Sequence, residues 1–143
     1  MMWCLMTRVA SCHCGQFTVE TTGEPMRVAI CHCEDCQRRT GSAFNLGAVY
    51  EESQVSLRGE YSTYHRTGDL GLDIEFHFCP KCGSNVHWIY DGVNVVAVGC
   101  YADPEFPQPT VSLYAKRRHS WVPAIKAIPS FVGGRDTRQE GDA

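Results

Sequence analysis

Residues 73–90 read DIEFHFCPKCGSNVHWIY, and this segment indicates how the middle of the chain folds. Before the cysteines, the apolar residues Ile74, Phe76 and Phe78 alternate with polar ones, which is the period-two pattern of a β-strand. A second short strand pattern follows over residues 85–90. The sequence therefore predicts a β-hairpin whose tip is a Cys-Pro-Lys-Cys-Gly knuckle.

The knuckle has the spacing of half a metal site. Two residues between Cys79 and Cys82 let both sulfurs face one ion, and Gly83 allows a close approach of the backbone. The alternative is a redox-active CxxC pair, but that motif normally opens the helix of a βαβ unit. A position in a hairpin favours metal binding.

Two further cysteine clusters precede the knuckle. The chain has nine cysteines, and seven of them lie in three tight groups. The groups are Cys12-His13-Cys14, Cys31-His32-Cys33-Glu34-Asp35-Cys36 and Cys79-Pro80-Lys81-Cys82. Four thiolates close a tetrahedral zinc site, whereas three leave one position open for water or substrate. If two metals bind, seven cysteines predict one closed site and one open site.

Spacing alone leaves the pairing of these groups open. The pair Cys12/Cys14 can join the knuckle, which leaves Cys31, Cys33 and Cys36 as a trio. It can also join the first two cysteines of the middle group, which leaves Cys36 with the knuckle. We favour the first arrangement because it keeps the compact CxCxxC group together and closes a long loop with the four-cysteine site.

A zinc ion with three thiolates is a weak Lewis acid for water and is better suited to a soft sulfur ligand. The trio therefore predicts a thiol substrate. The alternative is a closed second site, completed by His32, Asp35 or a distant residue. We expect His13 and His32 to point away from the metals, because the middle side chain of a CxC normally does.

The residues after the trio are candidates for substrate binding. Arg38 and Arg39 can pair with the carboxylates of a glutathione-like tripeptide, and Thr40 and Ser42 can add hydroxyl or backbone donors. The alternative is a solvated turn. A second basic group, Lys116–His119, has the same two interpretations.

The rest of the chain reads as one mainly β domain with little helix. Strands are expected at Gln16–Glu20, Ala43–Tyr50, Gln54–Arg58, Tyr61–His65, Val93–Val98 and Thr110–Ala115. Gly59-Glu60 predicts a hairpin turn, Asp91-Gly92 another turn, and the only helical candidate spans residues 34–39. We expect residues 1–10 to be an extension, 11–132 the zinc domain, and 133–143 a frayed polar tail.

Composition argues against a nucleic-acid-binding or a membrane-spanning protein. A net charge of −3 leaves no broad basic surface for nucleic acid, and no apolar run reaches the roughly 20 residues of a membrane span. The first residues lack the apolar segment of a signal peptide, so we expect a cytoplasmic protein with reduced thiols. His77 and His87 are expected on a strand surface, with His77 also a candidate proton shuttle. A homo-oligomer is compatible with the sequence.

The motifs together resemble a known family. CxC at 12–14, CHCxxCxRxxGSxF at 31–44, FCxxCGS at 78–84 and Trp-Val-Pro at 121–123 are similar to the glutathione-dependent formaldehyde-activating (GFA, or centromere-protein-V-like) domain. The resemblance runs from about Ser11 to Phe131. It implies a mainly β, Mss4-like β-tent of antiparallel sheets with zinc-binding knuckles.

The resemblance also implies a role for each cysteine group. Two Zn²⁺ ions per chain are implied, and the cysteines of the structural site are Cys12, Cys14, Cys79 and Cys82. Those of the catalytic site are Cys31, Cys33 and Cys36. The implied activity is that of a carbon-sulfur lyase that adds glutathione to formaldehyde reversibly, so the expected partners are a small thiol and an aldehyde. The alternative is a non-catalytic zinc domain that binds or carries a small thiol or a protein partner.

Overall fold

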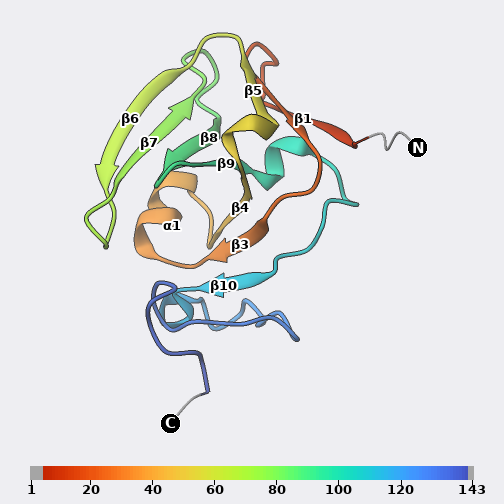
Figure 1. Cartoon of the computed structure of the whole chain (residues 1–143). Coiled ribbons are helices and arrows are strands. Elements are labelled where there is room, and N and C mark those ends of the chain that lie inside the picture. Colours follow the sequence, from red (N-terminus) through yellow and green to blue (C-terminus); the bar gives the residue numbers. More distant parts are fainter. Residues whose placement is uncertain (1–4, 142–143) are drawn as a thin grey trace. The chain divides into compact units, whose positions relative to one another are not determined.

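The computed structural model describes residues 5–141 of the chain. Within this range the protein is mainly β, with ten strands in two sheets and a single short α-helix (Figure 1), so the predicted fold class is confirmed. In this part of the chain no helix has the length and apolar character that crossing a membrane requires. Cys4 and the outer ends of the expected extension and tail lie outside the described residues.

The elements follow one another in short pieces. The first half contains β1 (Thr7–Ser11), β2 (Thr18–Thr22), β3 (Arg27–Cys31), α1 (Glu34–Thr40), β4 (Asn45–Tyr50), η1 (Glu52–Gln54), β5 (Val55–Arg58) and β6 (Ser62–Thr67). The second half contains β7 (Asp73–Phe78), β8 (Asn85–Tyr90), β9 (Val93–Ala97), η2 (Val98–Tyr101), β10 (Val111–Leu113) and η3 (Ala115–Arg117).

The chain forms two compact units, each built from two separate segments. The first unit contains the described residues up to Met26 together with Ala48–Phe106. The second contains Arg27–Gly47 together with the described residues from Pro107 onward.

In the first unit, the predicted hairpin around the knuckle is confirmed. β7 and β8 pair antiparallel, and the knuckle connects them. Asp91 and Gly92 both have positive φ, at 47° and 75°, which is the backbone of a tight two-residue hairpin turn. This turn leads from β8 into β9, which pairs with β8 as expected. The same unit holds an antiparallel three-stranded sheet in the order β1-β2-β5.

The predicted hairpin at Gly59-Glu60 is wrong. β5 pairs with β2 and β6 pairs with β7, so the chain passes from one sheet to the other at this turn. Gly59 has φ of +94°, and a Cβ there would lie 1.8 Å from the carbonyl oxygen of Gln16. A glycine is therefore needed at position 59, because the backbone there passes close to the backbone of Gln16. Gly59 and Glu60 lie where the chain passes between the two sheets.

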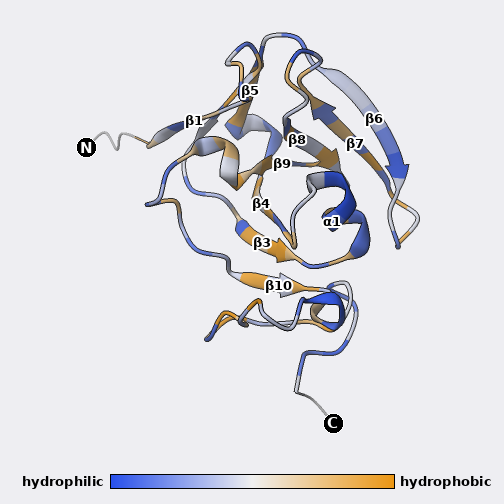
Figure 2. Ribbon diagram, turned by 180° about the vertical axis from the view of Figure 1, so that it is seen from behind, coloured by the Kyte–Doolittle hydropathy of each residue, from blue (hydrophilic) through white to orange (hydrophobic). Residues whose placement is uncertain are grey.

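The two faces of the β7–β8 hairpin differ in chemistry. Phe76 and Trp88 join Val49 and Val95 in an apolar cluster on one face. On the other face lie His77 and His87, which are each only 1% exposed, so the expected surface position of these histidines is wrong. The alternation of apolar and polar residues correctly predicted which side chains share a face of the hairpin, but it did not predict that side chains on both faces are buried. Figure 2 shows where apolar residues lie along the strands.

The buried histidines are satisfied by a chain of polar contacts. Nε2 of His77 lies 2.6 Å from a carboxylate oxygen of Glu75, and the Nδ1 atoms of the two histidines are 2.8 Å apart. Nε2 of His87 lies 2.7 Å from Oδ1 of Asn94. Burial lowers the pKa of His87 to about 4, so this imidazole is neutral at neutral pH. The chain of contacts lets polar side chains occupy the interior without unpaired atoms.

The second unit holds the helix and a parallel strand pair. β3 and β10 pair in parallel, with Ala29 opposite Val111, which departs from the all-antiparallel expectation. The approximately 80 residues between them leave room for a crossover that a hairpin loop does not provide. The helix α1 begins after Cys33 and ends at Gly41, whose φ of 67° suits glycine. Residues as far as Glu140 are tied by hydrogen bonds, although composition predicts a frayed tail here.

Candidate metal centres

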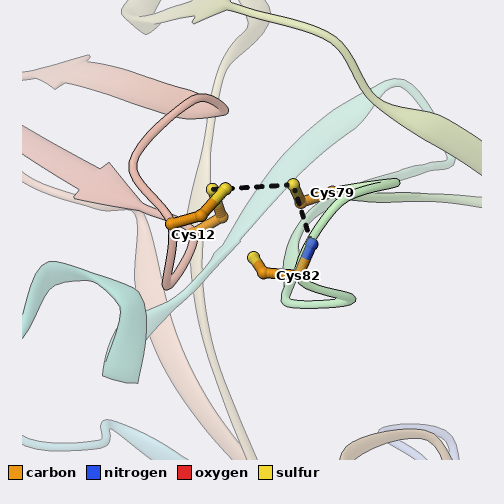
Figure 3. A group of neighbouring side chains, drawn as sticks. Cys12, Cys79 and Cys82 are labelled. Atoms are coloured by element: carbon orange, nitrogen blue, oxygen red, sulfur yellow. Dashed lines mark hydrogen bonds between the residues drawn. The ribbon is translucent and has the colours of Figure 1, made fainter.

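The first unit brings four cysteines together. Cys12 and Cys14 follow β1, and Cys79 and Cys82 lie at the connection between β7 and β8. Figure 3 shows the side chains of Cys12, Cys79 and Cys82. All four sulfurs lie within 4.8 Å of one another, and the Cys12–Cys14 and Cys14–Cys79 sulfur distances are 3.6 and 3.7 Å. A tetrahedral ion with Zn–S bonds of about 2.3 Å needs sulfurs about 3.8 Å apart. The arrangement therefore fits zinc without rearrangement.

Hydrogen bonds from the protein support the thiolates of two cysteines in this cluster, Cys79 and Cys82. The Sγ of Cys79 accepts from Nε2 of Gln16 at 3.0 Å and from the backbone of Lys81 and Cys82 at 3.3 and 3.4 Å. Against the effect of burial, these bonds lower the pKa of Cys79. The Ser84 hydroxyl and backbone lower the pKa of Cys82 to about 5. Both sulfurs are thus prepared to bind a cation as thiolates.

Gln16 is a contact that sequence reasoning missed. Its side-chain amide clamps the backbone of Glu60, donating to the carbonyl at 2.7 Å and accepting from the N–H at 2.9 Å. The same amide donates to Cys79, 63 residues away in the sequence. The sequence offered one clue to this contact, the position of Gln16 two residues after Cys14, because no local pattern relates Gln16 to Cys79.

We expect Gln16→Leu to weaken metal retention by the four-cysteine cluster. Loss of the amide removes one hydrogen-bond donor from the Cys79 thiolate. Removing a group that hydrogen-bonds to a metal ligand typically costs about tenfold or more in metal affinity. The rate of zinc transfer to a coloured chelator measures the effect. Gln54→Leu is the matched control, because the Gln54 amide donates to the backbone carbonyls of Thr22 and Glu24 in the same unit and, within the described residues, to no cysteine sulfur. Equal transfer rates in the two variants would contradict the role of Gln16.

The second unit brings the remaining three clustered cysteines together. Cys31 ends β3, Cys33 caps the start of α1, and Cys36 lies in the first helical turn. Their sulfurs also lie within 4.8 Å of one another. Within the described part of this unit, no fourth His, Cys, Asp or Glu completes the group. The structure therefore brings together the same two sets of cysteines that the sequence analysis favoured.

The three thiols are poorly stabilised as anions by the protein. Contact with the other two thiols and burial raise the pKa of Cys31 far above its usual range. For Cys36, a hydrogen bond from Cys31 is outweighed by Cys33 and burial, and its pKa rises to about 11. Three adjacent thiolates need a compensating cation, so the donor set fits a metal ion such as zinc.

The histidines of the cysteine motifs belong to neither cluster, as expected. His13 is exposed and His32 is buried, and no histidine is part of the two groups among the described residues. His32 packs edge-on against Phe44, and its Nδ1 has no hydrogen-bond partner in the described structure. A sequence position between two clustered cysteines therefore does not place either histidine in a cluster.

The candidate binding residues after Cys36 differ in what they contact. Arg38 is exposed, whereas Arg39 is half-buried, and its charge acts to lower the pKa of Cys36. The hydroxyl of Thr40 donates to the carbonyl of Cys36 at 2.7 Å and accepts from the backbone of Ser42 at 3.1 Å. Thr40 thus secures the end of the helix, and Arg39 is the candidate whose charge reaches Cys36.

Gln37 ties the helix to the C-terminal segment of the same unit. Its amide donates to the carbonyl of His32 at 2.8 Å and of Arg117 at 3.3 Å, and its Oε1 lies 2.9 Å from Nε2 of His119. Arg117 adds an ion pair with Glu34 at 3.2 Å. Part of the basic group Lys116–His119 is therefore fixed against the helix that carries Cys36.

Comparisons with known proteins agree with this architecture. A family model described as "Glutathione-dependent formaldehyde-activating enzyme" matches residues 7–117. A crystal structure of a Rhodobacter sphaeroides protein has a TM-score of 0.52 and 24% sequence identity, and the match covers 71% of this chain and 91% of that one. At this identity, the solved structure supports the fold alone. No curated protein matches the chain.

Proposed function

The chain belongs to the glutathione-dependent formaldehyde-activating enzyme family, and we propose that it adds a small glutathione-like thiol to formaldehyde or a related aldehyde. The observation that carries this proposal is the group of three thiols in the second unit, which has no fourth ligand from that unit's described residues. Three protein ligands leave a position for a substrate atom, and a sulfur-rich site favours a sulfur substrate. The reaction class is that of a reversible carbon–sulfur lyase.

The proposed site divides its tasks among a few residues. Cys31, Cys33 and Cys36 would hold zinc, which when bound supplies a Lewis acid that favours the thiolate form of a sulfur ligand. Arg39, whose charge reaches Cys36, would orient a substrate carboxylate, and the exposed Arg38 would offer a second cation. Ser42 is exposed and stays a candidate hydrogen-bond donor to the substrate, while Thr40 would contribute by holding the end of the helix in place.

The chemistry balances without a further reactant. The thiolate sulfur attacks the aldehyde carbon, a carbon–sulfur bond forms, and the carbonyl π pair moves to oxygen. The proton lost by the thiol reaches this oxygen and gives a hemithioacetal. The reverse reaction breaks the carbon–sulfur bond and returns thiol and aldehyde. Because thiols add to aldehydes unassisted, the enzyme is expected to supply only a modest acceleration.

The four-cysteine cluster is proposed to hold a second, structural zinc. Its four sulfurs lie within 4.8 Å of one another and would complete a tetrahedron around the ion, which would leave no position for substrate. All eight described cysteines are free thiols, which suits a reducing compartment, and we propose a cytoplasmic location.

The test is exchange NMR at equilibrium on the zinc-loaded protein. We expect the protein to accelerate the interconversion of formaldehyde and S-hydroxymethylglutathione above the spontaneous rate. Protein stripped of metal by a chelator is the control and should show the spontaneous rate only. Unchanged exchange together with measurable glutathione binding would overturn the enzyme and favour a non-catalytic zinc domain that binds or carries a thiol.

A further inference from the structure

Trp121 is held on the surface of the second unit in an unusual way. Its side chain is 71% exposed, more than any other large apolar side chain in the described structure. It is not on a loose loop, because the backbone of Val122 donates to the carbonyl of His119 at 2.9 Å and the Val122 side chain is buried. A rigid turn thus presents an indole ring to solvent, although exposure of such a ring is costly.

A short series of contacts joins this ring to the three-cysteine group. The rings of Trp121 and His119 are 5.4 Å apart, and Nε2 of His119 lies 2.9 Å from Oε1 of Gln37. Gln37 directly follows Cys36, and its amide also donates to the carbonyl of His32, between Cys31 and Cys33. These contacts connect the turn that carries the indole to the segment that carries the three thiols, within one unit.

The unit that carries the ring has an excess of basic residues. The segments of the second unit contain nine Lys and Arg against five Asp and Glu, whereas the whole chain has 13 against 16. Lys116 and Arg117 are exposed in the segment that leads to Trp121, and Arg117 is paired with Glu34 at 3.2 Å. An exposed aromatic face on a unit with an excess of basic residues suits a ligand that combines planar groups with negative charge.

We propose that Trp121, backed by His119, is a stacking platform for the part of the thiol substrate that does not react. This inference rests on the proposed function and deepens it: the platform selects acidic thiols that carry planar amide groups over small thiols. Planar amides stack on the indole face, and an aromatic side chain with two rotatable bonds on an ordered turn loses little conformational freedom on binding. Trp121 is thus a specificity-determining residue, not a catalytic one.

The test compares two thiols in Trp121→Ala and Trp121→Phe. With glutathione, we expect the KM of Trp121→Ala to rise about tenfold, which is the loss of about 1.4 kcal/mol of stacking, and Trp121→Phe to recover most of it. With 2-mercaptoethanol, which has no amide groups, KM should not change in either variant, and kcat should stay within about twofold for both thiols. Leu70→Ala removes an apolar side chain of similar exposure, 68%, from the first unit and should leave all values unchanged.

The outcomes separate this inference from the proposed function. An unchanged glutathione KM in Trp121→Ala, or equal losses with both thiols, would overturn the platform while leaving the reaction in place. If the wild-type protein accelerates neither reaction, the proposed function fails, and calorimetric titration of glutathione decides on the platform. A Kd about tenfold weaker in Trp121→Ala would then support it, and an equal Kd, or no binding to the wild type, would overturn it.

Discussion

Cys79→Ser is expected to unfold the first unit. Cys79 is fully buried, lies within 4.8 Å of three other thiols and accepts three hydrogen bonds, so no other cysteine of this cluster is as deeply integrated. Structural zinc sites contribute about 10 kcal/mol or more to folding, which is comparable to the whole stability of a domain. An ion shared by Cys14 and Cys79, which are 65 residues apart, would also close a long loop, and such a constraint on the unfolded chain amounts to about 4 kcal/mol.

The measurement for Cys79→Ser is the metal content of the purified variant together with its thermal unfolding by circular dichroism. We expect loss of one metal per chain and loss of the cooperative transition at temperatures where the wild type is folded. Cys100→Ser is the control, because Cys100 is a half-buried thiol of the same unit that belongs to neither cluster. A cooperative transition within a few degrees of the wild type in Cys79→Ser would show that the four-cysteine cluster does not hold the unit together.

Cys36→Ser is expected to abolish the proposed exchange reaction and leave the protein folded. Cys36 supplies one of only three sulfurs in its group, and serine is a poor ligand for a soft metal site, so the variant should lose one metal. The helix should persist, because its start depends on Cys33, whose sulfur accepts from the backbone N–H of residue 36, and this N–H remains in serine. We therefore expect exchange to fall to the spontaneous rate.

Three readouts on the same sample test Cys36→Ser: metal content, circular dichroism and exchange NMR. The expected result is half the metal of the wild type, an unchanged fold and no acceleration, whereas Cys100→Ser should keep all three. Full acceleration in Cys36→Ser would remove the three-cysteine group from the chemistry. Loss of the fold would show that this group, too, is structural.

Local patterns of the sequence predicted much of the fold. Alternation around Phe76 placed β7 and β8 with the observed bounds, and the position of α1 after the second cysteine group was correct within one residue. In contrast, β1 and β3 have no clear pattern, because each is defined by pairing with a strand elsewhere in the chain. The expected extension overlaps β1, whose residue Thr7 pairs with Thr22.

The cysteine groups were visible in the sequence because metal ligands must be close to one another. Cysteines one or two residues apart can share an ion, so the sequence limited the two sets of sulfurs to two possible pairings of the cysteine groups. The supporting contacts were not visible: Gln16 reaches Cys79, and Gln37 reaches His119, 82 residues away. Such contacts depend on where the backbone returns, and amide side chains carry no spacing rule.

The sequence by itself determined the fold class, the family and the seven sulfurs, since local alternation and ligand spacing are properties of neighbouring residues. Only the tertiary structure decided which groups surround those sulfurs, that His77 and His87 are buried, that the chain crosses between sheets at Gly59, and that Trp121 contacts His119, the partner of Gln37 in the helix of Cys36. The reason is physical: burial and hydrogen bonding between distant segments depend on the packing of the whole chain, and local patterns do not encode that packing.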